Sequence, residues 1–185
     1  MKIYTKTGDQ GETGLYDGTR APKSDLVFDV LGALDELSAH IGLLIFHLRK
    51  QNPKGDFDNV RNFFDNYTEV TKYLREIQQT LLNIGSIIAT PNPLEGQKLP
   101  VIVYDQVEKI EKEIDTMTQE LETLTVFILQ GGTTALDSQA HVCRTVTRRA
   151  EREIIKYSNV DENIIKYMNR LSDYFFTFAR YYSIK

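Results

Sequence analysis

Apolar residues recur at helical spacing in five long stretches of this 185-residue chain, and this periodicity restricts the folds open to it. The pattern predicts helices over residues 34–48, 60–89, 104–121, 136–157 and 162–182. Strand-like signals are confined to residues 2–4 and 126–129. Short connections between neighbouring helices favour an all-α fold, a ferritin-like up-and-down five-helix bundle.

Size and charge narrow the class of protein. A chain of this length is ordinary for one domain, so we expect a single domain over 1–185, with a binding loop at 1–25 and the bundle at 26–185. The net charge of -4 argues against a general nucleic-acid binder. The sequence contains no run of about 18 apolar residues, so we expect no membrane span. The single cysteine, Cys143, fits a reducing compartment.

The stretch 4–15, YTKTGDQGETGL, combines three glycines, three threonines and a lysine without apolar periodicity. Glycines let backbone N–H groups approach a ligand, and hydroxyls with an ammonium group suit phosphate oxygens. We therefore predict a polyphosphate-binding loop whose binding residues are Thr5, Lys6, Thr7, Gly8, Asp9, Gly11, Thr13 and Gly14. A plain structural turn is the alternative, because the stretch matches neither standard nucleotide motif.

The fourth expected helix has a polar stripe about 80° wide. It carries His141, Arg144, Arg148 and Glu151. A second face, expected to pack in the bundle, carries Val142, Val146, Ala150 and Ile154. The stripe suits an anionic ligand, although a solvated basic face with Glu151 paired to Arg148 gives the same pattern.

Five motifs follow one another along the chain. They are the stretch at 4–15, GALDEL at 32–37, FILQGG at 127–132, RTVTRRAER at 144–152 and NRLSD at 169–173. In these motifs the chain resembles the PduO-type ATP:cob(I)alamin adenosyltransferases, and the resemblance spans nearly its whole length. It departs from the family pattern at Ser38, at Gln130 in place of proline, and by one extra residue after Gly132.

The resemblance implies transfer of the 5′-deoxyadenosyl group of ATP to the cobalt of cob(I)alamin, with triphosphate as the second product. ATP and the corrinoid cobalamin are then substrates, and a magnesium ion accompanies the triphosphate. Because cobalt(I) is itself the nucleophile, the chain needs no Ser-His-Asp or Cys-His arrangement, and none is visible.

Residue roles also follow from the resemblance. It implies ATP binding by the loop, Lys23, Arg144, Arg148, Glu151 and Asn169. Lys23 and Arg148 would act in catalysis by neutralising the leaving triphosphate, and Phe127 would displace the lower axial ligand of the corrinoid. On composition alone, a Phe in an FIL run is ordinarily a core residue. The family further implies a homotrimer in which Asp35 pairs with Arg144 of a neighbouring subunit.

Two other functions stay open at this point. A non-catalytic trimer that binds ATP and cobalamin, and senses or delivers the cofactor, would share these motifs. A di-iron bundle is disfavoured because no Glu-x-x-His pair accompanies His40 and His47. As partners, the family implies a cobalamin reductase and an adenosylcobalamin-dependent enzyme. The expected location is the cytoplasm, or the mitochondrion for a eukaryotic source.

Overall fold

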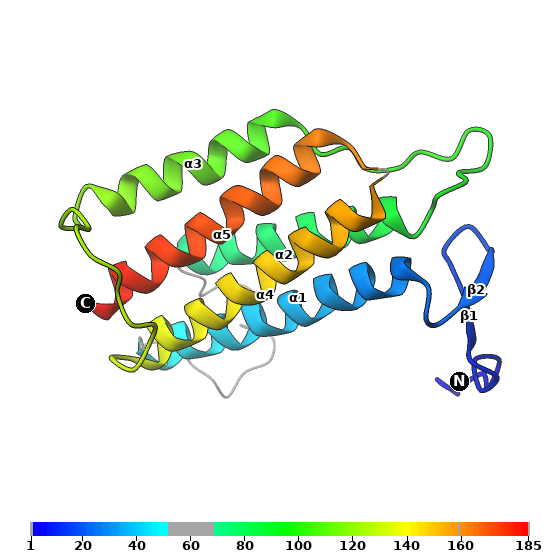
Figure 1. Cartoon of the computed structure of the whole chain (residues 1–185), viewed down its shortest axis with the longest axis horizontal. Helices are drawn as coiled ribbons and strands as arrows, with labels where there is room; N and C mark the ends of the chain where they lie inside the picture. Colours follow the sequence, from blue (N-terminus) through cyan, green and yellow to red (C-terminus); the bar gives the residue numbers. More distant parts are fainter. Residues whose placement is uncertain (1, 52–68, 159, 185) are drawn as a thin grey trace.

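The structure is a computed structural model that describes residues 2–51, 69–158 and 160–184. Its helices are α1 (Leu26–Gln51), α2 (Glu69–Ile88), α3 (Tyr104–Thr118), α4 (Ala135–Tyr157) and α5 (Glu162–Ser183). Figure 1 shows them side by side, each running opposite to the one before it. The expected up-and-down five-helix bundle is confirmed.

The core is built around α4. This helix packs against both α1 and α5, while α2 packs on α1 and α3 packs on α5. Every helix contributes an apolar stripe at helical spacing, as the sequence predicts. The largest fully buried side chains include Leu37, Ile41, Leu44, Leu74, Ile77, Leu81, Ile84, Tyr174, Phe175 and Phe178. The bundle therefore holds the outer face of α4 in a fixed place.

Helix boundaries differ from the expected ones in explicable ways. α1 begins at Leu26, earlier than expected, because Val27 and Val30 extend its buried stripe. α3 ends at Thr118 instead of residue 121, since backbone bonds from Glu120 to Met117 and from Leu121 to Thr118 tighten the chain into turns. The expected first part of the second helix, residues 60–68, lies outside the described residues.

Two β expectations were wrong. Residues 2–4 and 126–129 form no strand, and the strands that do form are β1 (Glu12–Gly14) and β2 (Arg20–Pro22). They pair antiparallel with Thr13 opposite Ala21. Three-residue strands are too short to show an alternating pattern, which is why the sequence did not reveal them. The hairpin carries the N-terminal segment past one end of the bundle (Figure 1).

By length and composition alone, α1 is long and apolar enough to cross a membrane. Many of its apolar residues, such as Leu37, Ile41 and Leu44, are nevertheless buried in the bundle, whereas Leu43 and Phe46 are exposed. Its outer face also carries the exposed carboxylates Asp35 and Glu36. These features are those of a core helix.

The start of α4 is fixed by a capping box. The Thr134 hydroxyl accepts a bond from the Asp137 N–H at 3.0 Å, and the Asp137 carboxylate accepts from the Thr134 N–H at 3.0 Å. Burial raises the pKa of Asp137, but hydrogen bonds from Thr134, Ser138 and Thr133 outweigh burial and hold that pKa below its usual value. The carboxylate therefore stabilises the fold above its unfolded-state pKa, and this contribution is lost as pH falls through the folded-state value.

We expect Thr134→Ala to lower the free energy of unfolding by about 1 kcal/mol, because an orphan N–H at the start of α4 loses its acceptor. Urea unfolding measures the loss. Thr116→Ala, which removes an exposed hydroxyl from the interior of α3, is the matched control and should change stability by less than about 0.5 kcal/mol. Equal stability of the Thr134 variant and the parent would contradict the capping role.

Candidate active site

The hairpin folds the N-terminal loop back onto Lys23. The Lys23 N–H donates to the Gly11 carbonyl at 2.8 Å. A methyl group added at Gly8 would lie 3.2 Å from Lys23 Nζ, so the ammonium group rests against the glycine. Two positions, Lys6 (φ 61°) and Gly11 (φ 84°), adopt left-handed backbone. The structure thus joins a flexible, glycine-rich backbone to a cation, as a phosphate site requires.

Other polar groups of the loop also gather here. The hydroxyls of Thr5 and Thr7 lie 2.9 Å apart. Arg20 donates to the Thr7 carbonyl at 3.0 Å and lies 3.7 Å from the Glu12 carboxylate. Arg20 was not predicted from the sequence, because only the register of the hairpin, with Arg20 opposite Gly14, brings it beside the loop. Thr13 and Gly14 lie on β1, and Asp9 lies shortly before it.

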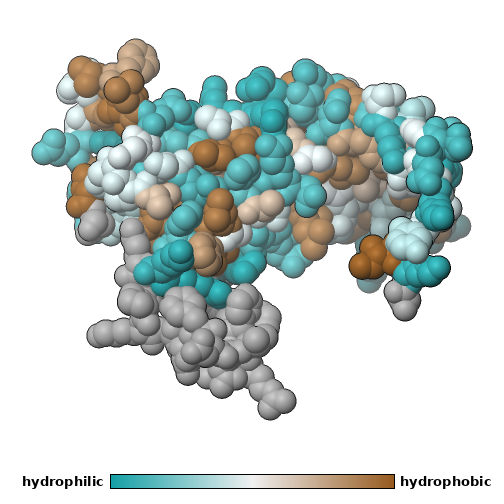
Figure 2. Space-filling view, turned by 90° about the horizontal axis from the view of Figure 1, so that it is seen from below, coloured by the Kyte–Doolittle hydropathy of each residue, from teal (hydrophilic) through white to brown (hydrophobic). Residues whose placement is uncertain are grey.

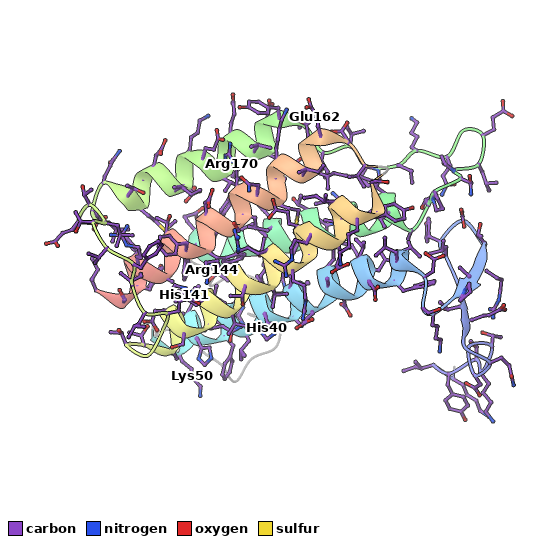
Figure 3. All side chains as sticks on the ribbon, viewed as in Figure 1. His40, Lys50, His141, Arg144, Glu162 and Arg170 are labelled. Carbon is purple, nitrogen blue, oxygen red and sulfur yellow. The ribbon has the colours of Figure 1, made fainter. Side chains whose placement is uncertain are left out.

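The polar stripe of α4 forms a second group. Figure 3 shows His141 and Arg144 next to one another on this helix. His141 is buried, Arg144 is half-buried and Arg148 is exposed. Burial first, and then the charge of Arg148, lower the pKa of Arg144. No carboxylate in the described part of the chain forms an ion pair with Arg144 or Arg148.

If the polar stripe of α4 were only a solvated basic face, Glu151 would pair with Arg148, but in the structure Glu151 has a different partner. Its carboxylate accepts a bond from Asn169 Nδ2 of α5 at 3.2 Å, and Asn169 Oδ1 accepts from Arg170 at 2.6 Å. The structure therefore unites Glu151 and Asn169. One expectation for α4 was wrong: Val142 is exposed, because Cys143 and Val146 occupy the inward face in its place.

The loop and the α4 stripe lie apart within one chain. Arg148 precedes the end of α4 by nine residues, which corresponds to about 13 Å of helix, and the hairpin extends past that end of the bundle (Figure 1). Among the described residues, no hydrogen bond joins residues 5–14 to Arg144 or Arg148.

Phe127 lies in the loop between α3 and α4 and is fully exposed, so the ordinary expectation of a core residue was wrong. Its neighbours Val126 and Leu129 are 73% and 97% exposed. Figure 2 shows hydrophobic side chains protruding at the end of the molecule remote from the N-terminal hairpin, the end at which this loop lies in Figure 1. An apolar group of this kind marks a surface that a ligand or another chain covers.

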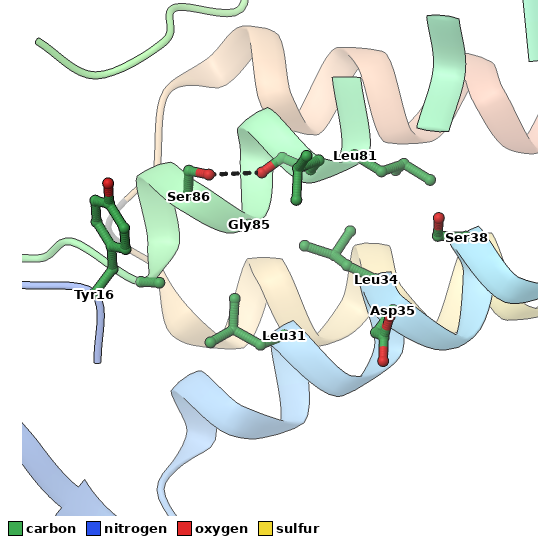
Figure 4. A pocket seen from close by; sticks show the side chains of 10 residues that line it. Tyr16, Leu31, Leu34, Asp35, Ser38, Leu81, Gly85 and Ser86 are labelled. Carbon is green, nitrogen blue, oxygen red and sulfur yellow. Dashed lines mark hydrogen bonds between the residues drawn. The ribbon is translucent and has the colours of Figure 1, made fainter. Parts of the chain in front are cut away.

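An apolar pocket of about 280 Å³ lies between α1 and α2 (Figure 4). Leu31, Leu34 and Leu81 form its walls, and the hydroxyl-bearing Tyr16 and the carboxylate-bearing Asp35 line it as well. Asp35 is exposed and has no hydrogen bond or ion pair with the described residues. Over the same residues, no cluster of three or more His, Cys, Asp or Glu side chains is placed to hold a metal ion.

The chain belongs to the cobalamin adenosyltransferase family, whose model matches residues 3–182. It is 39% identical to the human corrinoid adenosyltransferase MMAB, over the whole of this chain and 70% of that protein. It is 38% identical to a corrinoid adenosyltransferase of Bacillus subtilis, over 97% of this chain and 86% of the relative.

A solved structure agrees with this assignment. It is a phenylalanine-to-alanine variant of the PduO-type ATP:corrinoid adenosyltransferase from Lactobacillus reuteri, complexed with cobalamin and ATP. The similarity has a TM-score of 0.82 at 34% identity and covers 99% of this chain and 94% of that one. The fold and the family expected from the sequence are confirmed.

We expect Gly8→Ala to weaken ATP binding roughly three- to tenfold, because the new methyl group displaces the Lys23 ammonium from the loop. Calorimetric titration with ATP measures the change. Gly42→Ala, whose methyl group would make only an ordinary 3.8 Å contact with Gln78, is the control. Unchanged ATP affinity in the Gly8 variant would separate Lys23 from the nucleotide.

Proposed function

We propose that adenosyl transfer takes place in sites that neighbouring copies of the chain complete together. One copy supplies residues 5–14 and Lys23, and the next supplies Arg144, Arg148 and Glu151 of α4 with Asn169 of α5. The separation of these two groups within one chain supports the proposal. Because such a head-to-tail contact generates a ring, three copies forming a homotrimer would contain three equivalent sites.

The protein is a corrinoid adenosyltransferase, and its reaction needs no protein nucleophile. The electron pair of cobalt(I) forms a bond to the ribose C5′ of ATP, and the C5′–O bond breaks with its electrons leaving on triphosphate. In our proposal Lys6, Lys23 and Arg148 hold the triphosphate and neutralise the charge that develops on it. Catalysis then rests on positioning and electrostatics.

Magnesium fits this site as a companion of ATP. The described residues contain no ready-made cluster of metal ligands, whereas the loop offers the single carboxylates Asp9 and Glu12. Magnesium in nucleotide sites is held chiefly by phosphates and water, with one or two carboxylates. We therefore propose that the ion binds with the triphosphate beside the loop.

Phe127 is proposed to act on the corrinoid. A fully exposed aromatic ring on an apolar loop offers no donor atom to cobalt, so a corrinoid resting on it would lose its lower axial ligand. Axial ligation is a main control of the reduction potential of a metal cofactor. Phe127 would thus ease the reduction of cob(II)alamin to cob(I)alamin.

Asp35 and Arg144 are proposed to pair between copies. Asp35 is an unpaired carboxylate lining the α1–α2 pocket, and Arg144 is a half-buried cation without a carboxylate in the described part of its own chain. Removing one member of such a pair costs about 3 to 5 kcal/mol when the survivor stays buried.

Three further expectations stay predictions: a cobalamin reductase as partner, an adenosylcobalamin-dependent enzyme that receives the product, and a cytoplasmic location.

Residues at or beside the departures from the family pattern make regular local contacts. Gly131 and Gly132, which follow Gln130, adopt the left-handed backbone conformation (φ 76° and 96°). The Gly132 N–H donates to the Ser138 hydroxyl at 2.9 Å. Ser38 accepts a bond from Gln78 through its carbonyl at 2.7 Å. The similarity to corrinoid adenosyltransferases over nearly the whole chain supports a catalytic protein over the non-catalytic alternative.

We expect Phe127→Ala to lower turnover of cob(II)alamin with a reductant at least about tenfold, while turnover of prereduced cob(I)alamin changes far less. Parallel assays with the two corrinoid states give the ratio. Leu129→Ala, in the same exposed loop, should affect both assays in equal proportion. Normal turnover of cob(II)alamin by the Phe127 variant would refute the role assigned to the ring.

A further inference from the structure

Two buried side-chain atoms in the described part of the chain lack a hydrogen-bond partner, and both belong to α4. They are Nδ1 of His141 and Nε of Arg144. A buried polar atom without a partner is costly, so each such atom calls for an explanation. Their position three residues apart on one helix, where side chains share a face, suggests a common explanation.

The two atoms are chemically complementary. Arginine Nε carries a hydrogen and can only donate, whereas Nδ1 of a neutral histidine protonated at Nε2 can only accept. Phe176 of α5 covers the imidazole with its ring, the centroids lying 6.2 Å apart at 64°. An aromatic edge offers the imidazole no conventional partner, and no carboxylate in the described part of the chain forms an ion pair with Arg144, so each of the two atoms can supply what the other lacks.

We propose that His141 is a positioning residue of the active site: its Nδ1 accepts a hydrogen bond from Arg144 Nε–H and aims the guanidinium fork away from the bundle. A rotation of the Arg144 side chain toward the imidazole satisfies both buried atoms at once. The two terminal nitrogens of Arg144 then remain free for a carboxylate or a phosphate. What Arg144 binds rests on the proposed function, whereas the internal bond does not.

The surroundings of His141 favour its neutral form. Burial, followed by the charge of Arg144, lowers the pKa of the imidazole, and the carboxylate of Asp137 opposes them without reversing the direction. Arg148 adds a further positive charge one turn beyond Arg144. A neutral ring at neutral pH keeps one bare nitrogen, and a bare nitrogen is what Arg144 needs.

Histidine-selective ¹⁵N NMR of the intact protein tests the bond directly. The chain contains three histidines, and the signal lost in His141→Leu identifies His141. We expect a bare Nδ1 and a protonated Nε2. A protonated Nδ1 would overturn the proposal.

Matched variants provide a second measurement. His141→Leu keeps the buried volume but removes the acceptor, so we expect kcat/KM to fall about tenfold with helix content unchanged. His141→Asn places an amide oxygen close to the position of Nδ1 and should recover most of the loss. If the Leu and Asn variants behave alike, hydrogen-bond acceptance by His141 is not what matters.

Arg144→Lys separates this proposal from the proposed function. Lysine keeps the charge but has no Nε–H in a planar fork. If His141→Leu is fully active while Arg144→Lys is impaired, the positioning role fails and the role of Arg144 stands. If Arg144→Lys is also fully active, the assignment of Arg144 to the site fails as well.

Discussion

One electrostatic constraint governs the proposed site: a triphosphate carries several negative charges, and the cations suited to it lie in two separate places. Lys6 lies in the loop before β1 and Lys23 directly follows β2, whereas Arg144 and Arg148 lie on α4. The hairpin extends past the end of the bundle, whereas Arg148 lies nine residues before the end of α4 (Figure 1). In the arrangement that we propose, association of copies brings the two groups together.

The bundle fixes the position of α4, because α1 and α5 pack against it. Contacts with α1 and α5 bury one face of the helix, and the capping box at Thr134 fixes its start. The same helix carries Arg144 and Arg148, which form no ion pair with a carboxylate in the described chain, whereas Arg149 pairs with Glu36. The proposed binding groups are thus separate from the apolar residues that α4 buries, so a loss of binding need not imply a loss of folding.

Much of this was predictable from sequence, since long apolar stripes define helices and their inward faces. The stripe in α2, from Leu74 to Ile88, is buried as its period requires. The approach of Lys23 to Gly8, and the hydrogen bond from Arg20 to the loop, depend on a hairpin whose strands are three residues each. Strands this short leave no pattern in the sequence, so these contacts could not be predicted. The exposure of Phe127 was equally hidden, because an FIL run ordinarily indicates a core. The inferred pairing of His141 with Arg144 rests on burial, which periodicity alone does not give.

Activity in mixed assemblies tests the central claim most directly. Lys23→Met and Arg148→Met chains, each inactive alone, are co-expressed in equal amounts and assayed for adenosylcobalamin formation. If each site takes Lys23 from one copy and Arg148 from the next, random association restores roughly one quarter of the parental activity. Absence of restored activity in verified mixed assemblies would show that both residues act within one chain and would contradict the account.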